Sequence, residues 1–249
     1  MHGMDSHCHL EKMPEGTAEE AKKHISGIVT ICADIEDAKK TLSIIDNKFV
    51  FGALGLHPES SGKYSSSTID NYIQFIYKNR KEISAIGEVG LDYVWHKKKE
   101  QQEKDEEIFR QFIELSKELC LPLVIHSRGD NAVSDAIRIL SGSGCNGSIL
   151  HFFSGTEEDV KNATEQGYWI AYNTIICKSD RYWKLIEKTP VDRMLLETDA
   201  PWCSPFPNEK KNFPWNIQES AKKIAEILGM TQEDILKKTE ENTMKAYHL

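Results

Sequence analysis

Five of the nine histidines in this 249-residue chain lie at the ends of short apolar segments. Two of them belong to the segment Asp5-Ser6-His7-Cys8-His9, and the others are His57, His126 and His151. Because side chains alternate along a β-strand with a period of two, we expect Asp5, His7 and His9 to share one face and Cys8 to point away. Two imidazoles on one face of a strand can bind one divalent ion. The segment therefore predicts a metal site.

Carboxylates occur at similar positions in two further apolar segments, as Glu88 and Asp199. One histidine on a strand is usually a core residue, but five converging histidines without partners would each carry a desolvation cost. We therefore predict six metal ligands: His7, His9, Glu88, His126, His151 and Asp199. Six exceed what one tetrahedral ion uses, so we expect two ions about 3.5–4 Å apart. Glu88 would bridge them, with His7, His9 and Asp199 on one ion and His126 and His151 on the other.

The wider pattern alternates short β-branched runs with helical periodicity. Strands are expected at 3–9, 27–32, 49–57, 84–91, 122–127, 148–153, 168–173 and 193–199. Helices are expected at 17–25, 35–46, 67–81, 101–119, 130–140, 156–166, 179–188, 215–228 and 231–247, with a long loop at 58–67. Such alternation is typical of parallel sheets. It predicts a single α/β domain over residues 1–249, a (β/α)8 TIM barrel with its active site at the C-terminal ends of the strands.

A doubly wound open sheet is the alternative architecture. The sequence has neither a glycine-rich dinucleotide fingerprint after its first strand nor a phosphate-binding P-loop. The expected barrel would instead bring the chemistry-bearing residues of all eight strands to one end.

The composition restricts the class of protein further. A net charge of -8 argues against nonspecific binding of nucleic acid by the whole surface. Two divalent ions with Glu88 and Asp199 would nevertheless leave a locally positive site, about +2 if the imidazoles are neutral. No apolar run suits a bilayer, and residues 1–5 lack the features of a signal peptide, so we expect a cytoplasmic protein without a membrane partner. We expect reduced cysteines and a monomer or weak oligomer.

Six motifs together carry a family resemblance. They are MDSHCH (4–9), GLHP (55–58), IGEVGLDY (86–93), PLVIHSR (122–128), LHFFSG (150–155) and LETDAPW (196–202). In this order and spacing the chain resembles the TatD-type metal-dependent deoxyribonucleases. The resemblance implies a (β/α)8 barrel, a metal-dependent nuclease that acts on DNA with Mg²⁺, and the same six ligands. Family members also tend to carry a basic-Asn-Glu-Pro motif after strand 8, where this chain has Phe213 in place of the glutamate.

The residues also suggest catalytic roles. We expect Asp199 to orient or deprotonate the attacking water, with Glu88 as the second catalytic carboxylate. In the alternative, Asp199 is only a ligand. The native ion is expected to be Mg²⁺, and imidazole ligands also suit Zn²⁺, Mn²⁺, Fe²⁺ and Ni²⁺.

Other polar residues are expected to contact the substrate or to orient the ligands. His57 and Arg128 are candidates for substrate phosphate contacts, and Arg128 could bind a phosphate bidentately. The alternatives are a loop-anchoring hydrogen bond for His57 and an ion pair with an acidic loop residue for Arg128. Asp5, Asp92 and Glu197 are candidates for orienting the ligands from behind.

These residues predict a deoxyribonuclease that hydrolyses phosphodiester bonds at a two-metal site with a metal-activated water. We expect it to act exonucleolytically on single strands or on ends of DNA. An ester or amide hydrolase on the same barrel is the main alternative, and a non-catalytic scaffold is a third. Many barrel amidohydrolases bridge their metals with a modified lysine on strand 4, whereas this chain has Glu88 there.

Overall fold

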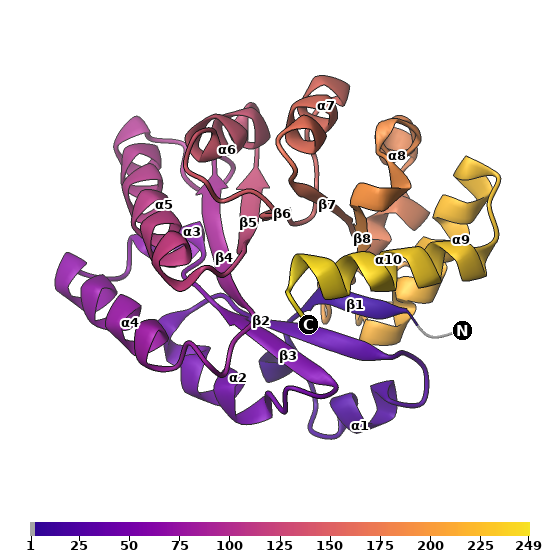
Figure 1. The fold of residues 1–249 in the computed structure, drawn as a ribbon, viewed down its shortest axis with the longest axis horizontal. Coiled ribbons are helices and arrows are strands. Elements are labelled where there is room, and N and C mark those ends of the chain that lie inside the picture. Colours follow the sequence, from indigo (N-terminus) through magenta and orange to yellow (C-terminus); the bar gives the residue numbers. More distant parts are fainter. Residues whose placement is uncertain (1–2) are drawn as a thin grey trace.

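The computed structural model describes residues 3–249, in which helices surround a barrel of eight parallel strands (Figure 1). Met1 and His2, on which part of the signal-peptide and domain predictions rests, lie outside the described residues. Each strand lies within its expected range or one residue beyond it. The strands are β1 (Met4–Cys8), β2 (Gly27–Cys32), β3 (Val50–Leu54), β4 (Ala85–Asp92), β5 (Leu123–Arg128), β6 (Ile149–Leu150), β7 (Trp169–Tyr172) and β8 (Met194–Leu196).

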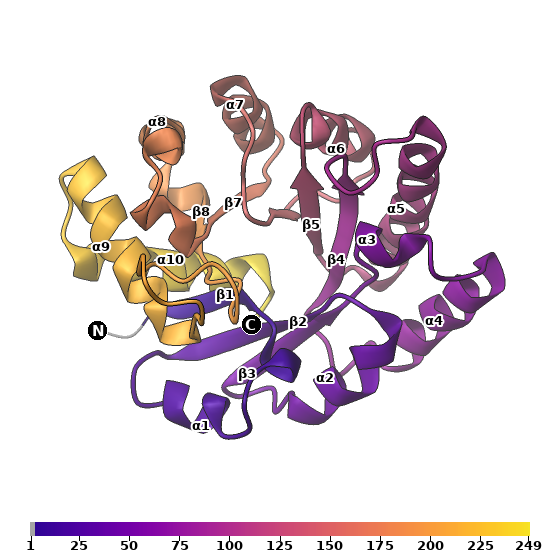
Figure 2. The same cartoon turned by 180° about the vertical axis from the view of Figure 1, so that it is seen from behind.

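The helices lie between the strands and after the last of them. They are α1 (Thr17–Ala21), α2 (Ala38–Ile44), α3 (Pro58–Ser61), α4 (Ser66–Lys78), α5 (Lys99–Leu119), α6 (Ala132–Leu140), α7 (Glu157–Glu165), α8 (Trp183–Lys188), α9 (Ile217–Leu228) and α10 (Gln232–Ala246). The expected long loop at 58–67 is wrong in part, because α3 forms there with Pro58 in its first turn. In the view from behind, α10 lies beside β1, and α9 packs against α10 (Figure 2).

The strand order follows the chain from β1 to β8, which confirms the barrel prediction and excludes the open sheet. Main-chain contacts link the last strand to the first: the Asp199 N–H donates to the His7 carbonyl at 2.9 Å, and the His9 N–H donates to the Ala200 carbonyl at 2.8 Å. These bonds place the ends of β1 and β8 side by side. The motif residues on both strands therefore reach the same end of the barrel.

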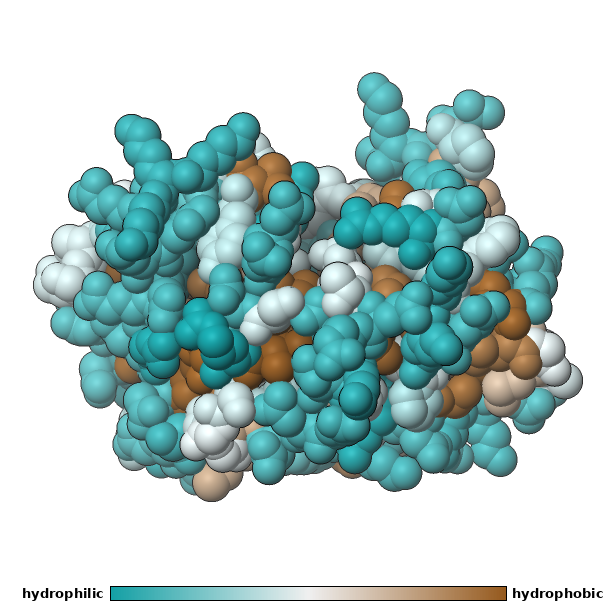
Figure 3. Space-filling model, turned by 90° about the horizontal axis from the view of Figure 1, so that it is seen from above, coloured by the Kyte–Doolittle hydropathy of each residue, from teal (hydrophilic) through white to brown (hydrophobic). Residues whose placement is uncertain are grey.

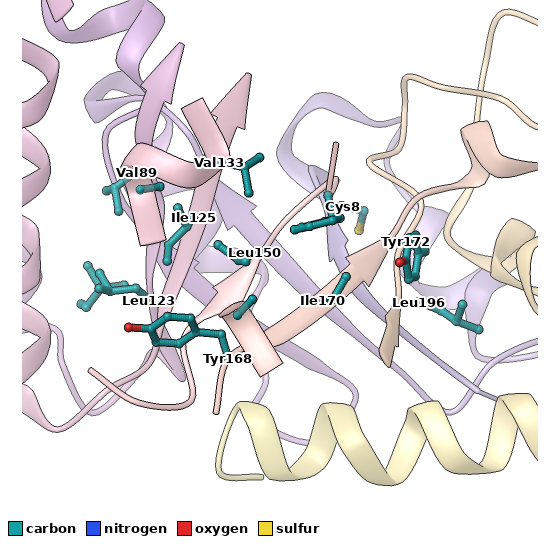
Figure 4. Packing of buried hydrophobic residues seen from close by; sticks show 14 of the residues in the cluster. Cys8, Val89, Leu123, Ile125, Val133, Leu150, Tyr168, Ile170, Tyr172 and Leu196 are labelled. Atoms are coloured by element: carbon teal, nitrogen blue, oxygen red, sulfur yellow. The ribbon is translucent and has the colours of Figure 1, made fainter. Parts of the chain in front are cut away.

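The apolar core has two layers. The inner layer draws on all eight strands and includes Met4, Val29 and Val124. The outer layer joins the strands to the helices and contains Cys8 (Figure 4). At the chain's end, the Tyr247 hydroxyl donates to the Ser6 carbonyl at 2.7 Å, so α10 is tied to the first strand.

One expectation about β1 is wrong. The pairing of β1 with β2 shifts between Asp5 and Cys8, which interrupts the two-residue alternation. Met4 packs in the inner layer, and its neighbour Asp5, which pairs with Ile28, lies on the opposite face. Asp5 therefore does not share the face of His7 and His9. Cys8 does point away from the barrel interior, as its place in the outer layer shows.

The face shown in Figure 3 is mainly hydrophilic, with apolar side chains showing between charged and polar ones. Among residues 3–249, no helix combines the length and the apolar character that crossing a membrane requires.

Glycine allows β4 to lie close to β5 where the site residues begin. Gly90 has a φ of +146°, and a Cβ atom there would lie 2.0 Å from the His126 carbonyl oxygen. A side chain at this position would need both an unfavourable backbone and a displaced β5. Gly90 therefore fixes the distance between the strands that carry Glu88 and His126.

We expect Gly90→Ala to lower the free energy of unfolding by more than about 1 kcal/mol, because the native conformation excludes a Cβ atom. Urea unfolding followed by circular dichroism measures this change. Gly62→Ala is the matched control, since a Cβ atom added at Gly62, which follows the short helix α3, would have no neighbouring atom within 4 Å. Equal stability of the two variants would contradict the close-approach argument.

Candidate active site

The buried carboxylate of Glu88 is the point on which five histidines converge. Glu88 is 3% exposed and lies in the middle of β4. The distances from its oxygens are 3.5 Å to His7 Nε2, 3.9 Å to His9 Nε2, 3.7 Å to His57 Nε2, 2.8 Å to His126 Nδ1 and 3.6 Å to His151 Nε2. The structure thus brings all five histidines of the strand ends together around one carboxylate.

Asp199 joins this group from the end of β8. Its Oδ1 lies 3.8 Å from His7 Nε2 and 3.3 Å from His9 Nε2, and these two nitrogens lie 3.2 Å apart. Asp199 adopts a φ of +55°, a left-handed conformation in which aspartate is enriched among non-glycine residues. The turn after β8 thereby brings this carboxylate to the pair of histidines on β1.

His126 and His151 are each held by a second carboxylate behind the ring. His126 Nε2 lies 2.9 Å from Asp92 Oδ2, and His151 Nδ1 lies 3.0 Å from a Glu197 carboxylate oxygen. Glu197 also accepts the Phe152 N–H at 2.8 Å. When such a ring is neutral, as metal binding requires, a carboxylate that accepts one ring N–H leaves the lone pair of the other ring nitrogen directed at the Glu88 side.

His57 is arranged differently. Its Nδ1 accepts the Glu59 N–H at 3.1 Å and so caps helix α3. In the neutral ring the proton is then on Nε2, the nitrogen that faces Glu88. His57 therefore presents a hydrogen-bond donor to the site while it also anchors a loop, so both predicted contacts are compatible in one ring.

The electrostatics follow from burial and from these contacts. Burial alone would raise the pKa of Glu88, but His151, His57 and the bond with His126 outweigh it and hold the pKa well below its usual range. Burial would lower the pKa of His126, but bonds to Asp92 and Glu88 raise it to about 9. For His57, burial and neighbouring His126 lower the pKa to about 3. Glu88 is therefore ionised and His57 neutral at pH 7.

The donor set fits divalent metal ions. His7, His9 and Glu88 can direct ligand atoms at a common point, as can Glu88, His126 and His151. Glu88 belongs to both groups, which suits a bridging role. Imidazole nitrogens with carboxylate oxygens are the donors that Zn²⁺, Mn²⁺ and Fe²⁺ prefer, and Mg²⁺ uses the carboxylates.

Two acidic residues lie beside β1 without reaching the Glu88 carboxylate. Asp5 accepts the Thr198 hydroxyl at 2.6 Å and the Thr198 N–H at 3.0 Å, so it links β1 to the turn that carries Asp199. Glu11, which the sequence analysis missed, is 2% exposed, and its Oε1 lies 3.5 Å from His9 Nδ1. The sequence signal for Glu11 was its position two residues after His9, because the turn after β1 places its carboxylate behind the His9 ring.

Arg128 lies at the rim, exposed to solvent. Within residues 3–249 its guanidinium forms no ion pair, which leaves it available to a ligand in the described part of the chain. Its strand neighbour Asp92 pairs with His126 instead.

The substituted motif after β8 still supports the loop. Asn212 donates to the Thr198 carbonyl and to the Thr174 hydroxyl, both at 2.9 Å. Phe213, at the position of the family glutamate, stacks on Trp215 with ring centroids 4.7 Å apart. A packing contact thus replaces whatever polar contact a glutamate would make there.

Most of these side chains line a cavity of about 1080 Å³: His9, His57, Glu88, Asp92, His126, His151 and Asp199. Its walls come from the end of β5 at Arg128 and from the loops that follow the strands, including Trp95, Phe152, Arg181 and Trp202. The cavity is large enough for a ligand of nucleotide size or larger.

Comparisons with known proteins show the family to which this chain is similar. The family model described as TatD related DNase matches residues 4–248. An uncharacterized metal-dependent hydrolase of Methanocaldococcus jannaschii is 32% identical, covering 98% of this chain and 96% of its own. Deoxyribonuclease TATDN3 of Homo sapiens is 29% identical, covering 98% and 94%. The crystal structure of YJJV, a TatD homolog from Escherichia coli, superposes with a TM-score of 0.87 at 23% identity, covering 99% and 98%.

The carboxylate behind His151 gives a prediction about metal affinity. In Glu197→Gln an amide nitrogen replaces one oxygen, so either the ring N–H of His151 or the Phe152 N–H faces a donor. We expect Zn²⁺ affinity, measured by competition with a chromogenic chelator, to fall about 10- to 100-fold. Glu165→Gln, a change at an exposed position, is the control. Wild-type affinity in Glu197→Gln would show that this carboxylate does not orient the ligand.

Proposed function

Because the chain belongs to the TatD related DNase family and is a metal-dependent hydrolase, we propose that it hydrolyses phosphodiester bonds of DNA at a two-metal site. The human relative named a deoxyribonuclease supports the choice of substrate. We further propose that it acts as an exonuclease on single strands or on ends of DNA.

One observation carries the proposal: a single buried carboxylate belongs to two groups of potential metal ligands. His7, His9 and Asp199 would hold one ion with Glu88, and His126 and His151 would hold the other. Two bound ions would supply an acidified water and neutralise charge on the phosphoryl oxygens. A shared carboxylate would hold two ions close enough to act together on the attacking and the leaving oxygen of an in-line displacement.

The chain's own residues position the reactants and move a proton. Asp199 is the proposed base: it is partly open to the cavity, whereas Glu88 is enclosed by imidazoles. Burial would raise the pKa of Asp199, but the bond with His9 and the nearby His151 lower it. Asp199 is thus ionised at neutral pH and can orient the attacking water and accept its proton.

The rim residues bind the phosphate. His57 donates its Nε2–H to a phosphoryl oxygen while its Nδ1 stays bonded to the Glu59 N–H. Arg128, without an acidic partner among the described residues, contributes a bidentate contact from the cavity wall. Both contacts are local, which suits a chain whose net charge is -8.

The proposal is tested with purified protein, single- and double-stranded DNA, and Mg²⁺, Mn²⁺ or Zn²⁺, beside carboxylic ester and amide substrates. We expect DNA cleavage that EDTA abolishes, and two metal ions per chain by mass spectrometry of the metal content. Turnover of esters or amides without any cleavage of DNA would instead establish the alternative hydrolase.

The role of Asp199 has its own test. We expect Asp199→Asn to lower kcat about 10²- to 10⁴-fold, the usual contribution of a general base. Metal content is measured on the same preparation, because an amide oxygen can still contact an ion. Glu209→Gln, an exposed change in the same loop, should match wild type. Near-wild-type turnover of Asp199→Asn at full metal occupancy would assign the proton transfer to another group.

A further inference from the structure

Two tryptophans at the cavity mouth have no part in holding metal or phosphate. Trp95 follows β4 and is 57% exposed, and Trp202 follows β8 and is 49% exposed. Both line the cavity that contains the histidines and Glu88. A large apolar ring left in water forgoes the free energy that its burial would provide, so a paired exposure at one cavity indicates a ligand surface.

The main chain of each tryptophan is tied to an aspartate of the site. The main-chain N–H of Trp95 donates to Asp92 Oδ1 at 2.9 Å, and the other oxygen of Asp92 lies 2.9 Å from His126 Nε2. The main-chain N–H of Trp202 donates to the main-chain carbonyl of Asp199 at 3.0 Å. Both tryptophans thus lie three residues after an aspartate of the site. Their turns are fixed by hydrogen bonds to Asp92 and Asp199.

The strands that precede these turns lie on opposite sides of the barrel. β4 and β8 are four positions apart in the order of eight, and Figure 1 shows them on different sides of the ring. The Trp202 ring meets the His9 ring edge-on at 5.0 Å, on the side of the proposed first ion. Trp95 is linked through Asp92 to His126, on the side of the second. The candidate metal site therefore lies between the two turns that carry Trp95 and Trp202.

The exposed Trp183 is a useful contrast. Its Nε1–H donates to the Ile176 carbonyl at 3.4 Å, and the Lys223 ammonium lies 5.2 Å from its ring centroid. In the described part of the chain, Trp183 is not one of the residues that line the cavity. The contacts of Trp183 therefore explain its position by packing alone, without a ligand.

We propose that Trp95 and Trp202 stack the two nucleobases that flank the scissile phosphate, one on each side. This inference rests on the proposed nuclease function and adds its substrate requirement. Every base has a π-face, so stacking on an indole tolerates any sequence. A base in a duplex already has its faces covered by its neighbours. The two contacts therefore select strands that are unpaired on both sides of the bond that breaks.

The test is a cycle in which bases and indoles are removed separately and together. The substrates are a 5′-fluorescent decathymidylate and two analogues of it. In the analogues, hydrogen replaces the base on the 5′ or the 3′ side of the phosphate whose cleavage is measured. The proteins are wild type, Trp95→Leu, Trp202→Leu, the phenylalanine variants at both positions, and Trp183→Leu as control.

We expect each base removal to lower the wild-type kcat/KM about 5- to 150-fold, the range that one base–aromatic stack provides. Trp95→Leu and Trp202→Leu should lose a similar factor on the complete strand. On the analogue that lacks the base stacked by the substituted tryptophan, each leucine variant should show no further loss of kcat/KM relative to wild type. One tryptophan should depend in this way on the 5′ base and the other on the 3′ base. Phenylalanine, which also stacks, should restore most of the loss. Anisotropy of the labelled strand with protein in EDTA should show weaker binding by the leucine variants.

Several outcomes would overturn the inference. Leucine variants that match Trp183→Leu on the complete strand exclude a substrate contact. If the loss of kcat/KM from removing a base and the loss from replacing a tryptophan multiply independently, that base does not stack on that indole. If a leucine variant unfolds, the analogues still decide with wild type alone, because undiminished cleavage without either base refutes the stacking. Failure of wild type to cleave any DNA refutes the proposed function itself and is visible before any variant is made.

Discussion

Glu88 carries a negative charge in a place where water scarcely reaches, and an ionised group so enclosed needs close compensating partners. Here the partners are imidazole nitrogens from four other strands or strand ends. Each must approach within hydrogen-bonding or ion-pair distance, which constrains the spacing of the strands. The glycine at position 90 meets that constraint between β4 and β5, because no side chain could occupy the gap.

A second layer of carboxylates then determines how each ring is turned. Asp92, Glu197 and Glu11 lie behind His126, His151 and His9 respectively. Two of them also hold the main chain: Asp92 accepts from the turn of Trp95, and Glu197 accepts from Phe152. Their charges offset part of the positive charge that two ions would bring. With these carboxylates counted, the charge of a two-ion site would be lower than +2, and the proposed phosphate binding would depend on direct contacts more than on net charge.

The sequence predicted the barrel and the converging residues because both depend on regular features. Strand–helix alternation fixes the topology, and polar residues at strand ends then meet at one rim, as His126 and His151 do. The prediction failed where regularity is broken. Asp5 was assigned to the wrong face because a register shift in β1 is a property of its pairing with β2, which strand periodicity does not encode. The dual contact of His57 required knowing that α3 begins at Pro58, within an expected loop.

Under the proposed function an acidic chain acts on a polyanion, and such a chain cannot depend on long-range attraction. The cavity wall carries Arg128 and Arg181, but Glu59 and Asp130 line it as well. Attraction must then come from contacts that act over a few ångströms: ligation at the floor, a donated hydrogen bond from His57, and apolar faces at the mouth. Such contacts require the substrate to enter the cavity, and a nucleotide can enter only when its base has left the duplex stack. The short range of the interactions is itself a source of selectivity for unpaired strands.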